Sequence, residues 1–538
     1  MSTNPRAVKK DQAEIGRELD TYRQPEKERV RQRILRHAVN LLTRRRSRTS
    51  IVRPRELQAV VNYAADALEQ LGRPDLRALV QDELDRWLEW QASRIQKRKP
   101  SELRLVYLCG PEPLNDLRVL LELGVNPHNV WGVESNEAAF RAALAELASA
   151  RLPVKLHKGT LTEFFERVPE TFDIAYLDTT GPILGGKPAA LSPTVELLRA
   201  ARLEPLSVLI TNFAEVPQPD SDRYARVMTD YFRFRFNDMP RCVEKTVDPA
   251  WTPFESGHMF KVVTSNLQKV YSDFITRLII DLARHWIPSA RGFRIMERQY
   301  LSEPATANST REAAYAPGKP AETMSEILRS VGDTVLSPGA YPLVSFLRSM
   351  QESDPGEPLI QQLGGMQFFG RSALELNRTV ALLDKIAEGH WSMASEELLQ
   401  AIGAPWFDRV STYERFTCDL PFPNLVVHSL LGIYGRPYFC SSRDSIRGRY
   451  TAKATEMFTD LFVLDQCRYY FDWFPTVPQA PSRFRSHAFQ VLARCILDRI
   501  WSSDRSPDTH PFRGSSVAGF TGLSDAPFHK LRKRNSWT

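Results

Sequence analysis

Two residues, Gly110 and Glu134, have the types and the spacing that a nucleoside-binding site needs. Gly110 ends the apolar run 103–110, and a glycine there lets backbone N–H groups approach a ligand closely because it lacks a Cβ atom. Glu134 lies 24 residues further on, at the end of the run 129–134, where a carboxylate can accept two hydrogen bonds from ribose hydroxyls. The alternative is that Gly110 makes a tight turn and Glu134 caps the next helix. We predict a nucleoside site, because both residues fall at strand ends.

Asp178 is a candidate for catalysis. It ends the apolar run 172–178, and an acid at that place can act as a general base or orient a nucleophile. The alternative is an acid that caps the following segment or is solvated at the strand end. Asn212 ends the run 206–212 and could add a polar contact, although an asparagine at a strand end is more often a turn residue.

Motifs of other enzyme classes are not found. The six cysteines and ten histidines form no CxxC, HxxxH or HExxH pattern, so we expect no metal site and interpret the cysteines as reduced thiols. The chain has no P-loop and no GxSxG motif. A Rossmann dehydrogenase is the main rival within the fold, but residues 108–116 lack its GxGxxG turn.

Short apolar runs and helical patterns alternate between residues 103 and 212. The runs 103–110, 129–134, 154–157, 172–178 and 206–212 are typical of buried parallel strands, and helical patterns at 115–123, 137–150, 161–168 and 193–201 separate them. This alternation predicts right-handed βαβ units and a parallel sheet, in which ligands bind at the carboxyl ends of the strands. After a helix at 221–234, two extended runs at 241–247 and 258–264 predict an antiparallel pair at the sheet edge.

These features resemble the class I S-adenosylmethionine (SAM) dependent methyltransferases over residues 103–263. The resemblance rests on the turn at Gly110, the acids at Glu134 and Asp178, and the final antiparallel pair. It implies a SAM site whose residues are Cys109, Gly110, Glu134, Gly159, Thr160 and Asp178. In this family the turn at Gly110 would contact the methionine part of SAM, Glu134 the ribose, and residues 159–161 the adenine.

The chain departs from the family pattern at three places. The first turn reads CGPEPLND instead of carrying two or three glycines, and Thr160 stands where the family often has aspartate. After Asp178 the sequence lacks the proline pair and the aromatic residue of methyltransferases that act on base amines. We therefore predict a SAM-binding methyltransferase-like protein with an unknown acceptor. The alternative is a catalytically degenerate methyltransferase fold that acts as an assembly or sensing module.

The fold class that we predict is α/β, with a Rossmann-like methyltransferase domain flanked by mainly helical N-terminal and C-terminal regions. The expected segments are a disordered N-terminus (1–26), a basic helical domain (27–100), the Rossmann domain (101–265), a helical extension (266–302), a linker (303–322), a helical C-terminal domain (323–502) and a flexible basic tail (503–538). The C-terminal helical domain could contact a protein partner. The aromatic residues between 406 and 474 lie in apolar patterns, so they are expected in the core instead of stacking on bases.

Charge and composition limit the partners. Hydrophobic residues make up 42% of the chain and charged residues 25%, as in ordinary globular proteins. The net charge of +7 is mild for 538 residues, but Arg44, Arg45, Arg46 and Arg48 form a dense cluster that could bind nucleic acid or be a solvated face. No apolar run reaches the roughly 18–20 residues of a membrane span, and residues 1–20 do not resemble a secretory signal. These features predict a cytoplasmic protein with no membrane partner.

Overall fold

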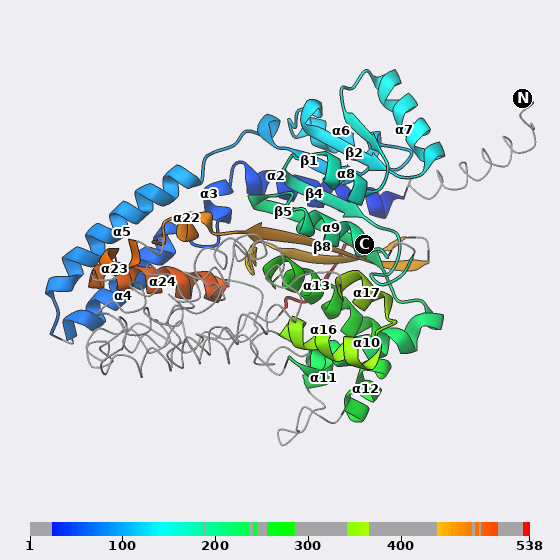
Figure 1. Ribbon diagram of the computed structural model, residues 1–538. Coiled ribbons are helices and arrows are strands. Elements are labelled where there is room, and N and C mark those ends of the chain that lie inside the picture. Colours follow the sequence, from blue (N-terminus) through cyan, green and yellow to red (C-terminus); the bar gives the residue numbers. More distant parts are fainter. Residues whose placement is uncertain are drawn as a thin grey trace, which may run out of the picture.

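The protein contains one mixed β-sheet with helices on both faces (Figure 1). The structure is a computed structural model, and it describes residues 24–70, 72–186, 189–235, 240–244, 256–285, 342–364, 438–452, 454–475, 479–483, 486–503 and 531–537. The predicted linker at 303–322 and the aromatic residues between 406 and 434 lie outside them.

Five strands form the parallel part of the sheet, as the alternation of strand and helix predicts. They are β1 (Leu105–Leu108), β2 (Val130–Glu134), β3 (Lys155–Lys158), β4 (Phe172–Asp178) and β5 (Leu203–Ala214). Each pairs parallel with its neighbours in the order β3-β2-β1-β4-β5. This is a Rossmann-like order, so the α/β fold class and the prediction of five parallel strands are confirmed.

Alternating side chains of these strands enter two separate cores, because successive residues of a strand point to opposite faces. On one face Leu105 and Tyr107 pack with helices α2 (Pro25–Leu42), α6 (Leu114–Glu122) and α7 (Glu137–Ala150). On the other face Val106 packs in a core that includes residues of α8 (Leu161–Arg167), α9 (Ser192–Arg199), α10 (Ser221–Arg233), α13 (Leu267–His285) and α16 (Pro342–Ser353). Figure 1 shows α2, α6 and α7 on one side of the sheet and α10, α13 and α16 on the other.

An antiparallel pair extends the sheet beyond β5, but it does not come from the predicted residues. Strand β8 (Thr455–Asp465) pairs antiparallel with β5 from Leu206 to Ala214, and β7 (Ile446–Ala452) pairs antiparallel with β8. The short strand β6 (Phe439–Cys440) also pairs with β8. These strands lie inside the segment that we expected to be mainly helical.

The prediction of strands at 241–247 and 258–264 is wrong. Residues Arg241–Glu244 form helix α11 and Ser256–Ser265 form helix α12, whereas 245–247 lie outside the described residues. Met259 and Val263 are buried and four residues apart, the spacing of one helix face. The edge of β5 is already occupied by β8, so these apolar side chains are buried by packing on α10 instead.

The N-terminal and C-terminal regions meet in a group of helices beside the sheet. Helices α4 (Pro54–Gln70), α5 (Asp75–Arg94) and α24 (His487–Ser503) contact one another. Shorter helices are α3 (Arg46–Thr49), α17 (Pro358–Gly364), α22 (Arg468–Phe471) and α23 (Ala480–Arg483). The described aromatic residues at 438, 439, 469, 470 and 474 are buried, as expected of core side chains.

The last described residues are docked on the sheet, which corrects the expectation of a flexible tail for 531–537. Residues Asn535–Ser536 form strand β9, which pairs parallel with β7. The backbone N–H of Trp537 donates to the carbonyl of Arg449 at 2.9 Å, and the indole ring lies where a Cβ on Gly448 would stand. The guanidinium of Arg534 forms a buried ion pair with Asp460.

The four arginines of the predicted basic cluster have different environments. Arg46 is buried, with Nη1 3.9 Å from Oδ1 of Asp173. Arg45 pairs with Asp444 at 3.4 Å, while Arg44 and Arg48 are exposed. Arg46 therefore lies in the protein interior and not on the same surface as the other three. In the described part of the chain, no helix is both long and apolar enough to cross a membrane.

Candidate functional site

A cavity of about 450 Å³ lies at the carboxyl ends of β1, β2, β3 and β4. All six residues predicted for the SAM site line it: Cys109, Gly110, Glu134, Gly159, Thr160 and Asp178. Four strands that are separated in sequence thus bring these residues together, because parallel neighbours end at the same edge of a sheet.

The turn after β1 forms one wall of the cavity. Gly110 has φ of +59°, in the left-handed region where a side chain is strained, so glycine suits this turn. Cys109 beside it is buried, and burial, together with the nearby charge of Glu134, raises the pKa of its thiol to about 12. The Cys109 thiol is therefore protonated at neutral pH and is a poor nucleophile.

Glu134 is half-buried at the end of β2. Its Oε1 accepts a hydrogen bond from the backbone N–H of Asn136 at 2.7 Å. The N-cap of helix α7 is Asn136, whose side chain accepts from the N–H of Ala139 at 3.0 Å. Helix capping therefore does not explain why an acid stands at position 134.

Thr160 has a structural role in addition to lining the cavity. Its hydroxyl accepts from the N–H of Glu163 at 3.2 Å, and the Glu163 carboxylate accepts from the N–H of Thr160 at 2.9 Å. This reciprocal pair is a capping box that begins helix α8. The N–H of Gly159 donates to the carbonyl of Glu134 at 3.0 Å, which ties the ends of β2 and β3 together.

Asp178, the predicted catalytic acid, is held by an ion pair and a hydrogen bond. Nζ of Lys27 lies 2.9 Å from its Oδ2, and Nδ2 of Asn212 donates to its Oδ1 at 2.7 Å. Burial by itself raises the pKa of this carboxyl, but Lys27, Asn212 and the charge of Arg31 outweigh it and lower the pKa below its usual value. Asp178 is thus ionised at neutral pH and is a weak base while these partners remain.

A second buried pair lies next to it. Nε of Arg31 is 2.5 Å from Oδ1 of Asp116, and both side chains are buried. Burial is the largest effect on Asp116 and raises its pKa to about 6, although the charge of Arg31 opposes the shift. Arg31 and Asp116 also line the cavity, so helix α2 forms part of its wall.

Lys27 and Arg31 were not among the residues predicted for the site, because the helix that carries them was expected to belong to a separate basic domain. A signal was present in the sequence. Lys27 and Arg31 are four residues apart and continue the buried stripe that includes Ile34 and Ala38. Cations on the apolar face of a helix need buried partners, which here are Asp178 and Asp116.

Asn212 connects the cavity to the antiparallel strands. Its Nδ2 also donates to the hydroxyl of Tyr450 at 2.9 Å, and its Oδ1 accepts from the hydroxyl of Thr459 at 2.8 Å. Tyr450 lies on β7 and Thr459 on β8. The antiparallel strands β7 and β8 therefore also orient the Asn212 amide, which donates to Asp178.

Two buried tyrosines fix the loop after β4, which forms another wall. The N–H of Ile183 donates to the hydroxyl of Tyr271 at 2.8 Å, and the N–H of Leu184 donates to the hydroxyl of Tyr224 at 2.9 Å. The Tyr271 hydroxyl in turn donates to the carbonyl of Ala214 at 3.0 Å.

In the residues that the structure describes, no group of three or more His, Cys, Asp or Glu side chains is placed to hold a metal ion.

Comparisons with known proteins give a distant structural likeness. No protein-family model and no curated protein sequence matches the chain. Among solved structures, the chain is similar to that of a putative caffeoyl-CoA O-methyltransferase from Staphylococcus aureus, at 15% sequence identity. The match covers 35% of this chain and 71% of that one, with a TM-score of 0.17. At this TM-score the likeness carries no weight in the assignment of a function. The resemblance to a methyltransferase fold therefore rests on strand order and on the antiparallel pair beyond β5.

Proposed function

We propose that the cavity at the ends of β1–β4 binds SAM and that the protein is a SAM-dependent methyltransferase with an acceptor yet to be identified. The observation that carries the proposal is that the six residues predicted from the sequence, which lie at four strand ends, line one cavity. Its volume of about 450 Å³ is within the range of small-molecule sites, about 300–1,000 Å³.

The residues present fit the groups of SAM. Glu134 offers a half-buried carboxylate to the ribose hydroxyls. The turn at Gly110 carries no Cβ, so a ligand can approach its backbone closely. Thr160 and Leu161 line the side assigned to the adenine. When bound, SAM supplies a methyl group on a positively charged sulfur.

Asp178 and its neighbours would form the acceptor side. In the docked position of α2, Lys27 neutralises Asp178, which then orients groups instead of accepting protons. If Lys27 moves away, the pKa of Asp178 rises because burial is no longer balanced by that charge, and the carboxylate becomes a stronger base. Catalysis by Asp178 in this proposal thus depends on where helix α2 lies.

The Lys27–Asp178 and Arg31–Asp116 pairs favour a second candidate function. Helix α2 pairs two cations with the acids of the cavity. Such buried ion pairs would hold the helix in place as a permanent wall of the cavity. In that case the domain would bind SAM, or its product, as a sensing or assembly module and would transfer no methyl group.

Calorimetric titration with SAM and with S-adenosylhomocysteine tests the shared part of both candidates. We expect both compounds to bind, and Glu134→Ala to weaken binding about 5- to 150-fold, the effect of losing about 1–3 kcal/mol of polar contacts. Glu137→Ala is the matched control, because Glu137 is also acidic and near in sequence but is exposed and pairs with Lys158 and Arg141. Failure of both compounds to bind would reject the SAM site. Equal losses in the two variants would reject the role of Glu134.

A further inference from the structure

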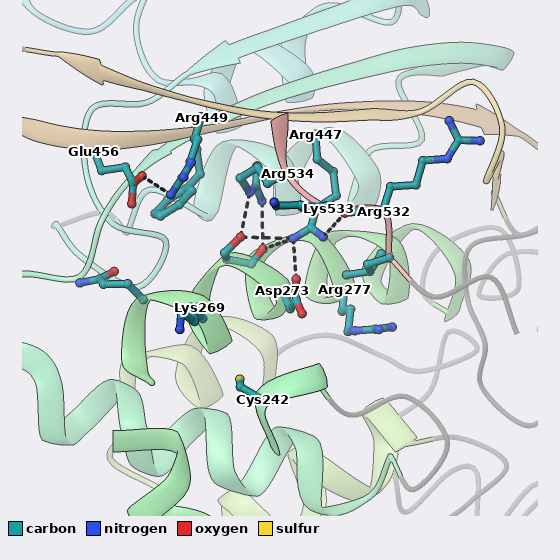
Figure 2. A pocket seen from close by; sticks show the side chains of 14 residues that line it. Cys242, Lys269, Asp273, Arg277, Arg447, Arg449, Glu456, Arg532, Lys533 and Arg534 are labelled. Carbon is teal, nitrogen blue, oxygen red and sulfur yellow. Dashed lines mark hydrogen bonds and ion pairs between the residues drawn. The ribbon is translucent and has the colours of Figure 1, made fainter. Parts of the chain in front are cut away.

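We propose that a second cavity, which shares no lining residue with the proposed SAM site, binds a small ligand that carries a chain of phosphate groups. The cavity has a volume of about 730 Å³ and lies between α13, strands β7 and β8, and the C-terminal segment 531–534 (Figure 2). None of its lining residues lines the first cavity. The proposal therefore does not depend on SAM binding.

The charge of this cavity is strongly positive. Its lining includes seven basic residues, Lys269, Arg277, Arg447, Arg449, Arg532, Lys533 and Arg534, and only two acidic ones, Asp273 and Glu456. A concave surface with one sign of charge concentrates ligands of the opposite sign. Oligophosphates match it because lysine and arginine are the usual binders of phosphate oxygens.

Three of these arginines are held by carboxylates. Nη2 of Arg447 is 2.8 Å from Oδ1 of Asp273, Arg534 pairs with Asp460, and Nη1 of Arg449 is 3.0 Å from Oε1 of Glu456. Lys269, Arg532 and Lys533 are exposed and form no ion pair with any residue that the structure describes. Lys269 and Lys533 supply the charge that a ligand would neutralise, whereas Figure 2 shows the Arg532 side chain directed away from the cavity.

The buried arginines fix the segment that carries two of the exposed cations. Nη1 of Arg447 donates to the carbonyl of Arg532 at 3.0 Å, and its side chain is only 2% exposed. Nε of Arg534 donates to the hydroxyl of Ser272 at 2.8 Å, and its Nη1 donates to the carbonyl of Gly448 at 2.9 Å. The backbone of Arg532 and Lys533 is thus anchored to α13 and β7, so less conformational entropy is lost when a ligand binds.

The shape and the lining favour phosphate recognition by a small ligand over nucleic acid. The cations come from α13, β7 and the C-terminal segment and surround one concavity, whereas a nucleic-acid strand is typically bound along an extended basic groove. The aromatic ring of the lining, Phe458, has the guanidinium of Arg534 over it at 5.1 Å from the ring centre. With this face of the ring covered, the phosphates and not a base would be the recognised groups.

Titration with inorganic tripolyphosphate tests the proposal on the full chain. We expect binding that weakens with salt, and an affinity at least about tenfold lower in Lys269→Ala/Lys533→Ala. Arg55→Ala/Arg118→Ala removes the same charge from exposed residues outside the cavity and should change the affinity less than twofold. The charge-retaining variant Lys269→Arg/Lys533→Arg should bind as wild type. Circular dichroism and melting temperature show that each variant is folded.

Two further ligands distinguish the sources of the phosphates. ATP that binds as tightly as tripolyphosphate would assign recognition to the phosphates alone and support the site. Much tighter binding of ATP would show that the nucleoside is recognised too and would contradict recognition of the phosphates alone. No tripolyphosphate binding at millimolar concentration, or equal losses in the cavity and control variants, would overturn it. A 20-nucleotide single-stranded RNA that binds through Lys269 and Lys533 while tripolyphosphate does not would replace the small ligand by nucleic acid.

Discussion

Nζ of Lys27 lies 2.9 Å from Oδ2 of Asp178, which joins the N-terminal helix to the end of the fourth strand of the sheet. Both side chains are about nine-tenths buried, with 11% of each exposed. The pair places a cation from outside the Rossmann-like unit on the acid that the sequence nominates for catalysis. The charge of Lys27 on helix α2 is thus one of the causes that lower the pKa of Asp178.

Replacing Lys27 by methionine should destabilise the docking of α2. Loss of one partner of a buried ion pair typically costs about 3–5 kcal/mol, because the other charge stays buried. Thermal melting and limited proteolysis near the N-terminus measure the effect. Lys27→Met/Asp178→Asn should recover much of the loss, since no uncompensated charge remains. The control is Arg29→Met on the same helix, where the exposed pair with Glu26 is worth at most about 1 kcal/mol. Equal effects of the two single changes would contradict this account.

The variant Asp178→Asn separates the enzyme from the module. If Asp178 acts as the base or orients the acceptor, the variant should retain SAM binding and lose about 10²-fold in methyl transfer. The measurement is incorporation of labelled methyl groups from SAM into a cell extract that contains protein, nucleic acid and small molecules. Transfer at the wild-type rate would remove Asp178 from the mechanism. SAM binding by the wild type without any incorporation would favour the sensing or assembly function.

The Asp116 carboxyl should make stability depend on pH near 6. Its pKa of about 6 in the folded chain is above the value of 3.8 for a free side chain, so the folded state holds its proton to higher pH. The resulting stabilisation is complete below about pH 4 and is lost as the pH rises through 6. From pH 5 to pH 7 this amounts to about 1 kcal/mol. The melting temperature of wild type should fall more over this interval than that of Asp116→Asn. A variant whose decrease is as steep as that of wild type would refute the assignment.

Replacing Gly448 by alanine should release the C-terminal segment. A Cβ at this position would overlap the indole ring of Trp537, which is buried against β7. Faster hydrogen exchange of the Trp537 N–H, which donates to the carbonyl of Arg449, would report the release. Gly257→Ala is the control, because a Cβ there meets no atom within 4 Å. Trp537→Ala/Gly448→Ala removes the overlap but also the ring, so exchange of the backbone N–H of residue 537 should remain fast. Unchanged exchange in Gly448→Ala would show that the ring adapts.

The release of this segment should also weaken tripolyphosphate binding, because Lys533 lies just before Trp537. SAM binding should not change, since none of these residues lines the first cavity. This pair of measurements separates the second site from a general loss of stability.

The sequence by itself determined the parallel part of the sheet and the residues at its strand ends. Apolar runs such as 172–178 and the helices between them are local patterns, and the right-handed connection of βαβ units leaves few ways to assemble them. That is why residues as separate as Gly110, Glu134 and Asp178 could be expected around one cavity.

The tertiary structure alone decided which segment pairs with the edge of β5 and which side chains pair with Asp178 and Asp116. The edge of β5 pairs with β8, whose residues are mostly buried, and the cost of closing a loop grows only slowly with its length, so this strand can come from far along the chain. Residues 258–264 were expected to form a strand, but Met259 and Val263 are buried there on one face of helix α12. The contacts of Lys27 with Asp178 and of Asn212 with Tyr450 join residues more than a hundred positions apart, and no local pattern encodes such partners.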